Sequence, residues 1–166
     1  MPNQNNNKNS IKPENKIKDV LNGDKQKNAL DFIEFLQANE FMLKERDENG
    51  NGWNATYDGI LTNCIYFDVA GFEFIINFCT LDFNGDGFID DDLKNFTWAH
   101  TVICPQGCGS SEICEKSQKH IKIFGKDYEN ICISPLQFLN PDADDLPYIK
   151  KLILMIKQNI DDNVSN

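Results

Sequence analysis

Residues 72–79, FEFIINFC, decide the fold of this chain. Every second residue is large and apolar, so one face of a strand is ready for burial. That face carries Phe72, Phe74, Ile76 and Phe78. Ala70-Gly71, directly before, favours a tight turn, and residues 60–69 form the preceding strand. The pattern predicts an antiparallel hairpin at the centre of the fold.

Shorter segments extend this hairpin toward the N-terminus. Residues 41–45 begin a strand, and residues 53–57 alternate apolar and polar side chains. Between them lies Asp47-Glu-Asn-Gly-Asn-Gly52, which is dense in turn-forming residues. Short turns join neighbouring antiparallel strands, so we expect a meander of about four strands.

Helical periodicity marks three other stretches, residues 25–39, residues 91–103 and the stretch from Asp144 to about residue 160. Between the last two lie a cysteine-bearing loop and a hairpin that turns at Gly125. The fold class is therefore α+β. Its expected order is an N-terminal helix, a sheet of about four strands, a second helix, the loop with its hairpin, and a C-terminal helix. These elements form a single domain over residues 25–162.

Residues 1–24 are expected to form a disordered tail. They include seven Asn and no aromatic residue, and their few apolar residues lack a sustained period. A segment of this kind buries too little apolar surface to offset the entropy lost on ordering.

The composition excludes several classes of protein. The 166 residues carry a net charge of −10, whereas nucleic-acid-binding proteins show a basic surface. No apolar run approaches the ~20 residues of a membrane helix, and no nucleotide-binding glycine motif is present. The start, MPNQNNNKNS, lacks the apolar core of a secretion signal. We therefore expect a soluble cytoplasmic protein without a nucleic-acid or membrane partner.

Four late cysteines are the main candidate site: Cys104, Cys108, Cys114 and Cys132. Three of them fall within an eleven-residue loop, and the fourth follows a predicted hairpin. Thiolates brought together in this way bind tetrahedral zinc. His100, four residues before Cys104, is an alternative ligand, and His120 is a weaker one. Disulfides, redox-active thiols and inert thiols stay open as alternatives.

The two earlier cysteines, Cys64 and Cys79, fall in predicted strands. A cysteine in a strand usually behaves as a small buried apolar residue. This is the interpretation taken for both.

An acidic segment, residues 82–92, resembles the start of an EF-hand or dockerin calcium loop. The oxygen-bearing positions of that pattern fall on Asp82, Asn84, Asp86, Phe88 (backbone carbonyl) and Asp90, with Gly87 at the sixth position. Position twelve, where these families have a bidentate carboxylate, is Leu93, and Asp92 comes one residue early. A surface turn followed by helix-capping aspartates explains the segment more simply. Residues 47–52 show a weaker version of the pattern, and a hairpin turn explains them too.

Residues 121–132, IKIFGKDYENIC, follow several cysteines and precede Asn140-Pro-Asp142 and a final helix. The arrangement resembles a pattern in small bacterial proteins that share a late cysteine cluster and have no established activity. This resemblance implies a coherent domain and four late cysteines that act together. The sequence thus favours a non-catalytic binding or interaction module, for an unknown protein or small-molecule partner, with a structural zinc. Calcium binding through residues 82–92 and thiol redox chemistry are the alternatives.

Overall fold

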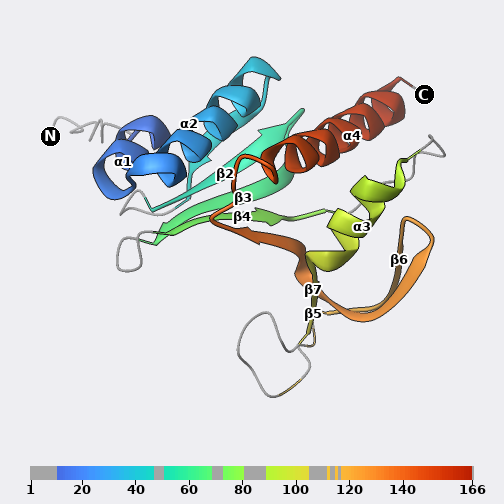
Figure 1. Cartoon of the computed structure of the whole chain (residues 1–166). Helices are drawn as coiled ribbons and strands as arrows, with labels where there is room; N and C mark the ends of the chain where they lie inside the picture. The colour runs from blue at the N-terminus through green and yellow to red at the C-terminus, as the bar shows by residue number, and fades with distance from the viewer. Residues whose placement is uncertain are drawn as a thin grey trace, which may run out of the picture.

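The computed structural model describes residues 11–46, 51–68, 73–80, 89–104, 112, 115 and 117–165. These residues form an α+β fold in which helices lie over one face of an antiparallel sheet (Figure 1). The expected fold class is therefore confirmed, but the sheet has seven strands in place of about four.

Three helices build the layer above the main part of the sheet (Figure 1). They are α1 (Pro13–Val20), α2 (Gly23–Ala38) and α4 (Leu146–Val164). The apolar stripe of α4 recurs every three or four residues and is buried along its whole length. It consists of Leu146, Ile149, Leu152, Ile153, Ile156 and Ile160. The C-terminal helix expected from this period is thus present.

Helix α1 corrects the expectation of a disordered tail up to residue 24. Pro13 occupies the first turn, where its missing N–H costs nothing. Ile17 and Val20 follow at helical spacing, and Ile17 is fully buried in the main core. Few apolar residues suffice here because α2 already offers a surface on which they pack. Residues 1–10 lie outside the described residues.

Strands β1 (Met42–Glu45), β2 (Gly52–Tyr57), β3 (Ile60–Asp68) and β4 (Glu73–Phe78) pair antiparallel in chain order. This is the meander expected from the sequence. Its helix-facing side chains form the main core with the helices. They include Trp53, Ile65, Phe67, Phe74, Ile76 and Phe78, none more than 2% exposed. The alternation in residues 72–79 thus does place one face of a central strand against helices, although Phe72 itself is outside the described residues.

The second half of the chain adds three strands, of which two form the hairpin expected to turn at Gly125. After α3 (Asp91–Ala99) come β5 (Thr101–Ile103), β6 (Gln118–Ile123) and the long β7 (Lys126–Leu139). The end of β7 pairs with β4 and so extends the main sheet. Its beginning pairs with β6, and the two form the distal hairpin (residues 118–131), which has a small core of Ile123, Tyr128 and Ile131.

β5 pairs with β7 across an irregularity. Thr101 pairs with Leu136, but Ile103, two residues later, pairs with Ile131, five residues earlier on β7. Residues 132–135 of β7 are therefore bulged, and they include Pro135, which cannot donate to a ladder. The bulge separates the part of β7 in the main sheet from the part in the distal hairpin.

The helix expected over residues 91–103 is shorter in the structure. α3 stops at Ala99, and the chain turns at His100 into strand β5. Thr101, Val102 and Ile103 are β-branched, and such residues suit a strand better than the last turn of a helix.

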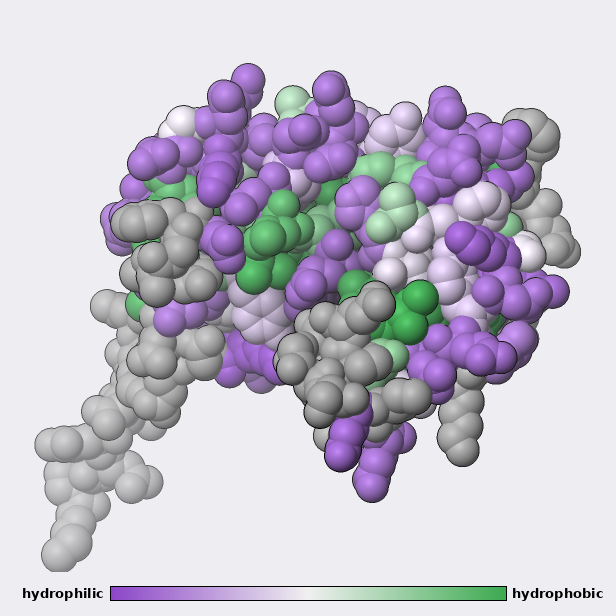
Figure 2. Space-filling model, turned by 60° about the horizontal axis from the view of Figure 1, so that its bottom comes forward, coloured by the Kyte–Doolittle hydropathy of each residue, from purple (hydrophilic) through white to green (hydrophobic). Residues whose placement is uncertain are grey.

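The other face of the main sheet has no helix over it among the described elements (Figure 1). Figure 2 turns this side of the molecule forward and shows mostly hydrophilic side chains, with hydrophobic ones between them. Within the described part of the chain, no helix is long and apolar enough to cross a membrane.

Candidate functional site

The described late cysteines, Cys104 and Cys132, lie on neighbouring strands. Cys104 follows the last residue of β5 and is 4% exposed. Its amide N–H donates to the carbonyl oxygen of Asn130 at 2.7 Å, and Cys132 lies two residues further along β7. The structure therefore brings these two predicted ligands to adjacent strands. Cys108 and Cys114 lie outside the described residues.

The strands that flank the cysteine-bearing segment meet β7 at the same residue. Ile131 pairs with Ile103 of β5 and with Gln118 of β6. One residue has two strand neighbours only if they lie on opposite edges, so both ends of residues 104–118 are within about 10 Å of each other. In residues 11–46, 51–68, 73–80, 89–104 and 117–165, no three potential metal ligands cluster.

His100 does not take the position expected of a zinc ligand. It caps α3 at the end where the chain turns, so it does not share a helix face with Cys104. Its Nδ1 is 2.9 Å from the carbonyl oxygen of Phe96. Its ring packs against those of Phe96 and Phe138, with centroids 4.5 and 4.8 Å away. His120, on β6, is 3.4 Å through Nε2 from a carboxylate oxygen of Asp127.

Of the candidate calcium loop, residues 82–88 lie outside the described residues, and so do residues 47–50 of the weaker pattern. Asp90 is described and acts as the N-cap of α3, accepting a hydrogen bond from the Leu93 amide at 2.8 Å. It also pairs with Lys151. The hydrogen bonds from Lys151 and from the Leu93 amide lower the pKa of Asp90. This carboxylate therefore has the capping role expected of it, and its charge is matched within the protein.

A second cysteine pair, not expected from the sequence, lies on the open face of the main sheet. The sulfurs of Cys64, on β3, and Cys79, just after β4, are 3.0 Å apart. The Cys79 amide donates to the carbonyl oxygen of Thr62 at 2.9 Å, and Cys64 lies two residues further along β3. Cys64 is 6% exposed and Cys79 is partly exposed. Cys64 is therefore buried as expected, whereas Cys79 is only partly buried, and the contact between the two sulfurs was not expected.

The two sulfurs differ in electrostatics. The hydrogen bond from Cys79 lowers the pKa of Cys64 to about 6, with help from the Arg46 guanidinium and against the effect of burial. The same contact raises the pKa of Cys79, because a thiolate already lies beside it. Either sulfur can donate in this contact, and the opposite pKa shifts favour ionisation at Cys64 over Cys79.

Polar groups surround the Cys64 sulfur on this face. The strand register aligns Asn54, Cys64, Asn77 and Gln137 across β2, β3, β4 and β7, and we call these residues the lateral row. As a thiol, Cys64 donates through Sγ to Asn54 Oδ1 at 3.5 Å, and Gln137 Nε2 donates to Asn77 Oδ1 at 3.0 Å. The Arg46 guanidinium lies over the ring of Tyr66, 5.1 Å from its centroid.

The sequence contained a signal for this pair. In a hairpin that turns at Ala70-Gly71, residues at equal distances before and after the turn lie opposite each other. Cys64, six residues before Ala70, is therefore expected opposite Asn77, six residues after Gly71, and the two do pair. Cys79 is then a diagonal neighbour of Cys64. The contribution of Arg46 is harder to predict, because it depends on the pairing of a third and a fourth strand.

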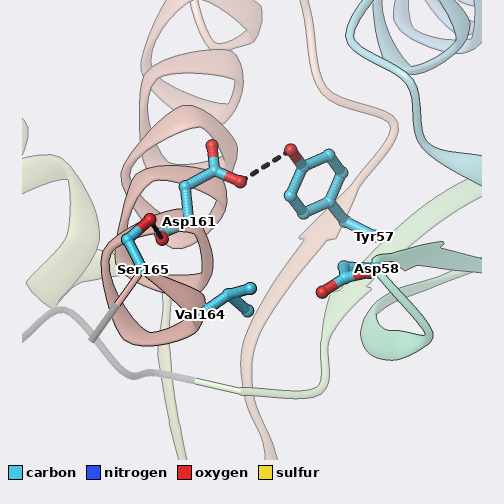
Figure 3. Close-up of a pocket in the computed structure, with 5 residues that line it drawn as sticks. All are labelled: Tyr57, Asp58, Asp161, Val164 and Ser165. Atoms are coloured by element: carbon cyan, nitrogen blue, oxygen red, sulfur yellow. Dashed lines mark hydrogen bonds between the residues drawn. The ribbon is translucent and has the colours of Figure 1, made fainter.

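The end of α4 borders an open hollow of about 520 Å³ (Figure 3). Tyr57 points across it, and its hydroxyl donates to Asp161 Oδ1 at 2.7 Å. Lys157 donates to the same hydroxyl and lies over the Tyr57 ring. That hydrogen bond raises the pKa of Lys157. These polar groups satisfy one another, so the hollow is explained by packing and gives no evidence of a ligand.

The chain was also compared with known proteins. No protein-family model matches it, and neither the curated proteins nor the solved structures include a significant match.

Proposed function

We propose that this protein is a thiol–disulfide redox protein whose reactive group is the pair Cys64 and Cys79. The observation that carries the proposal is the 3.0 Å separation of the two sulfurs. A disulfide bond is about 2.05 Å long. The sulfurs therefore need to approach by only about 1 Å to form the bond.

The electrostatics of the pair support the same function. Thiolates, not thiols, are the nucleophiles in disulfide exchange. A Cys64 sulfur that ionises near pH 6 is a thiolate at neutral pH, while Cys79 keeps its proton. Reactive and resolving thiols of known redox proteins differ in this sense.

The setting of the pair favours reversible chemistry. A new bond would join β3 and β4, which are already paired in the main sheet, so no large movement of the chain is required. The cytoplasmic location expected from the sequence would keep the resting pair reduced.

Redox titration tests the proposal. The full chain is oxidised with diamide and then equilibrated in glutathione buffers of decreasing potential, and disulfides are mapped by mass spectrometry of peptides. We expect a Cys64–Cys79 disulfide that a dithiol reductant reverses. Cys64→Ser and Cys79→Ser should abolish it, and Cys132→Ser, in the other cysteine pair, is the matched control that should retain it. A pair that stays reduced at every potential would refute the function.

A second candidate, structural zinc held by Cys104, Cys108, Cys114 and Cys132, is favoured by a separate observation. Both ends of the segment that contains Cys108 and Cys114 are anchored at Ile131, beside Cys104 and Cys132. Four thiolates would complete a closed site with no open position for catalysis. The domain would then be a binding or interaction module with a zinc-stabilised end.

Elemental analysis tests this second candidate. Protein purified without chelator should contain about one zinc per chain, and Cys132→Ser should lose it while Cys79→Ser keeps it. Metal-free protein, with the late thiols unaltered, would contradict the zinc site.

A further inference from the structure

We propose that Cys64 is the sulfur that attacks a small hydroperoxide, that Cys79 resolves the product, and that Arg46 positions the attacking sulfur. The inference rests on the proposed redox function and adds an oxidant class and a direction. It starts from the unequal surroundings of the two sulfurs.

Exposure limits what can reach Cys64. The residue is only 6% exposed, although it lies on the helix-free face of the sheet. Attack on a disulfide requires three sulfurs in line, and a glutathione or protein disulfide is bulky around the attacked sulfur. Hydrogen peroxide is little larger than water. The burial of Cys64 therefore selects a small hydroperoxide over a disulfide as the oxidant.

Arg46 is placed to assist this reaction. It is the only arginine of the chain, and its guanidinium, which lies over Tyr66 two residues along β3 from Cys64, lowers the pKa of the Cys64 sulfur. Two contacts hold it there: its amide donates to the carbonyl oxygen of Gly52 at 2.8 Å, and its side chain lies over Tyr66. A planar cation at this place keeps the thiolate oriented and stabilises the negative oxygen that leaves during attack.

The proposed oxidation has two balanced steps. The Cys64 thiolate attacks one peroxide oxygen, the O–O bond breaks, and hydroxide leaves, so Cys64 becomes a sulfenic acid and the peroxide is reduced. Cys79 then transfers its thiol proton and attacks the Cys64 sulfur. The S–O bond breaks, water leaves, and the disulfide forms. The 3.0 Å separation means that the second step needs no unfolding.

Reduction proceeds from the other sulfur. An external thiolate attacks the more exposed Cys79, and the S–S bond breaks with Cys64 leaving as a thiolate. A thiol of low pKa leaves faster than one of high pKa, so both exposure and leaving ability favour this direction. A second external thiol then releases Cys79 and completes the cycle as a disulfide.

Trapping of the sulfenic acid tests the direction. Cys79→Ser and Cys64→Ser are each treated with hydrogen peroxide in the presence of dimedone, and the adduct is mapped by mass spectrometry. We expect an adduct on Cys64 in Cys79→Ser and none on Cys79 in Cys64→Ser. An equal or larger adduct on Cys79 would overturn the assignment.

Arg46→Gln tests the positioning role. We expect disulfide formation by peroxide to slow by about tenfold and its pH dependence to move to higher pH, without a matching loss of thermal stability. Arg46→Lys should recover part of the rate, because charge is kept but the planar geometry is not. Lys44→Gln is the matched control: it removes one positive charge from the same sheet face, at a position paired with Asn54, and should leave the rate unchanged. An unshifted pH profile in Arg46→Gln would refute its role.

The azo oxidant diamide separates the two levels of the proposal. A disulfide formed with diamide but not with peroxide would reject the hydroperoxide inference and leave the redox function standing. If neither reagent forms it, the function itself fails.

Discussion

The two cysteine pairs have the same backbone relation but different surroundings. In each pair, the amide of one cysteine donates to the carbonyl oxygen of the residue two positions before the other cysteine. Cys79 donates to Thr62, two residues before Cys64, and Cys104 donates to Asn130, two residues before Cys132. The first pair lies in a sheet packed on helices, and the positive charge of Arg46 acts on both of its sulfurs. The second adjoins a hairpin whose buried core has three residues. The same backbone relation thus occurs in two surroundings, and the functions proposed for the two pairs differ because those surroundings differ.

The largest effect that would sharpen this comparison is expected for Cys132→Ser. The distal hairpin buries three residues, with Trp98, Ile121 and Phe124 packed against them, and a core of this size gives a hairpin little stability. If zinc supplies the missing stability, the free energy of unfolding of the distal hairpin should fall by about 4 kcal/mol or more. Hydrogen exchange of the β6 and β7 amides measures this change. Cys79→Ser is the control, and an equal effect of the two substitutions would remove the proposed difference between the pairs.

A smaller effect is expected from shortening one isoleucine in each core. Ile76→Ala and Ile131→Ala both create a cavity at a fully buried position and should cost about 2–5 kcal/mol. Ile76 lies in the main core, so its loss should destabilise the whole domain. The loss of Ile131 should increase exchange mainly in the distal hairpin. Equal effects across all amides in both variants would show that the two regions unfold as one.

The ionisation of Cys64 gives a third test, by pH titration of the ultraviolet absorbance of the thiolate. One thiol should titrate near pH 6, and in Cys79→Ser its pKa should rise toward the ordinary value of about 8.5. Folding lowers the pKa of Cys64, so its ionisation stabilises the fold above the ordinary thiol pKa. That contribution is lost as pH falls through about 6. A titration unchanged in Cys79→Ser would show that the sulfur–sulfur contact does not set the pKa.

The smallest effect concerns Asn63, the neighbour of Cys64 on the opposite face of β3. It is fully buried, and neither atom of its amide has a partner among the described residues. Asn63→Leu keeps the shape and removes the unsatisfied groups, so unfolding should become harder by about 1 kcal/mol. Urea denaturation measures the gain. An unchanged titration of the Cys64 thiolate in this variant would show that the two faces of β3 act independently. A loss of stability would contradict the prediction and imply that Asn63 has a partner outside the described residues.

Local patterns predicted most of the main sheet, because its strands follow one another along the chain. Alternation in β2 and β4 and the period of α2 and α4 marked the side chains that meet in the core. The hairpin of β6 and β7 was also predicted, whereas β5 and the pairing of β7 with β4 were harder to predict. β5 has three residues, and β7 pairs with three other strands, which only the complete topology reveals.

The candidate sites likewise differ in whether they depend on local spacing or on the pairing of strands. Spacing along the chain drew attention to the late cysteines, which lie close in sequence. Cys64, Cys79 and Arg46 lie on or beside different strands and come together through the pairing of β1 to β4, so no spacing along the chain marked them as a site. Capping of α3 by an aspartate depends on that helix alone and was predicted correctly, and Asp90 is the residue that does so.

The bulge in β7 separates the distal hairpin from the main sheet, so the hairpin can change in evolution or by design without altering the sheet. Residues 132–135 break the register with β5, so a change in strand length beyond them does not shift the pairing of Leu136–Leu139 with β4. The distal hairpin can therefore be lengthened or exchanged for another while the main core stays intact. Among related chains, we expect the length and sequence of the distal hairpin to vary more than those of β3 and β4.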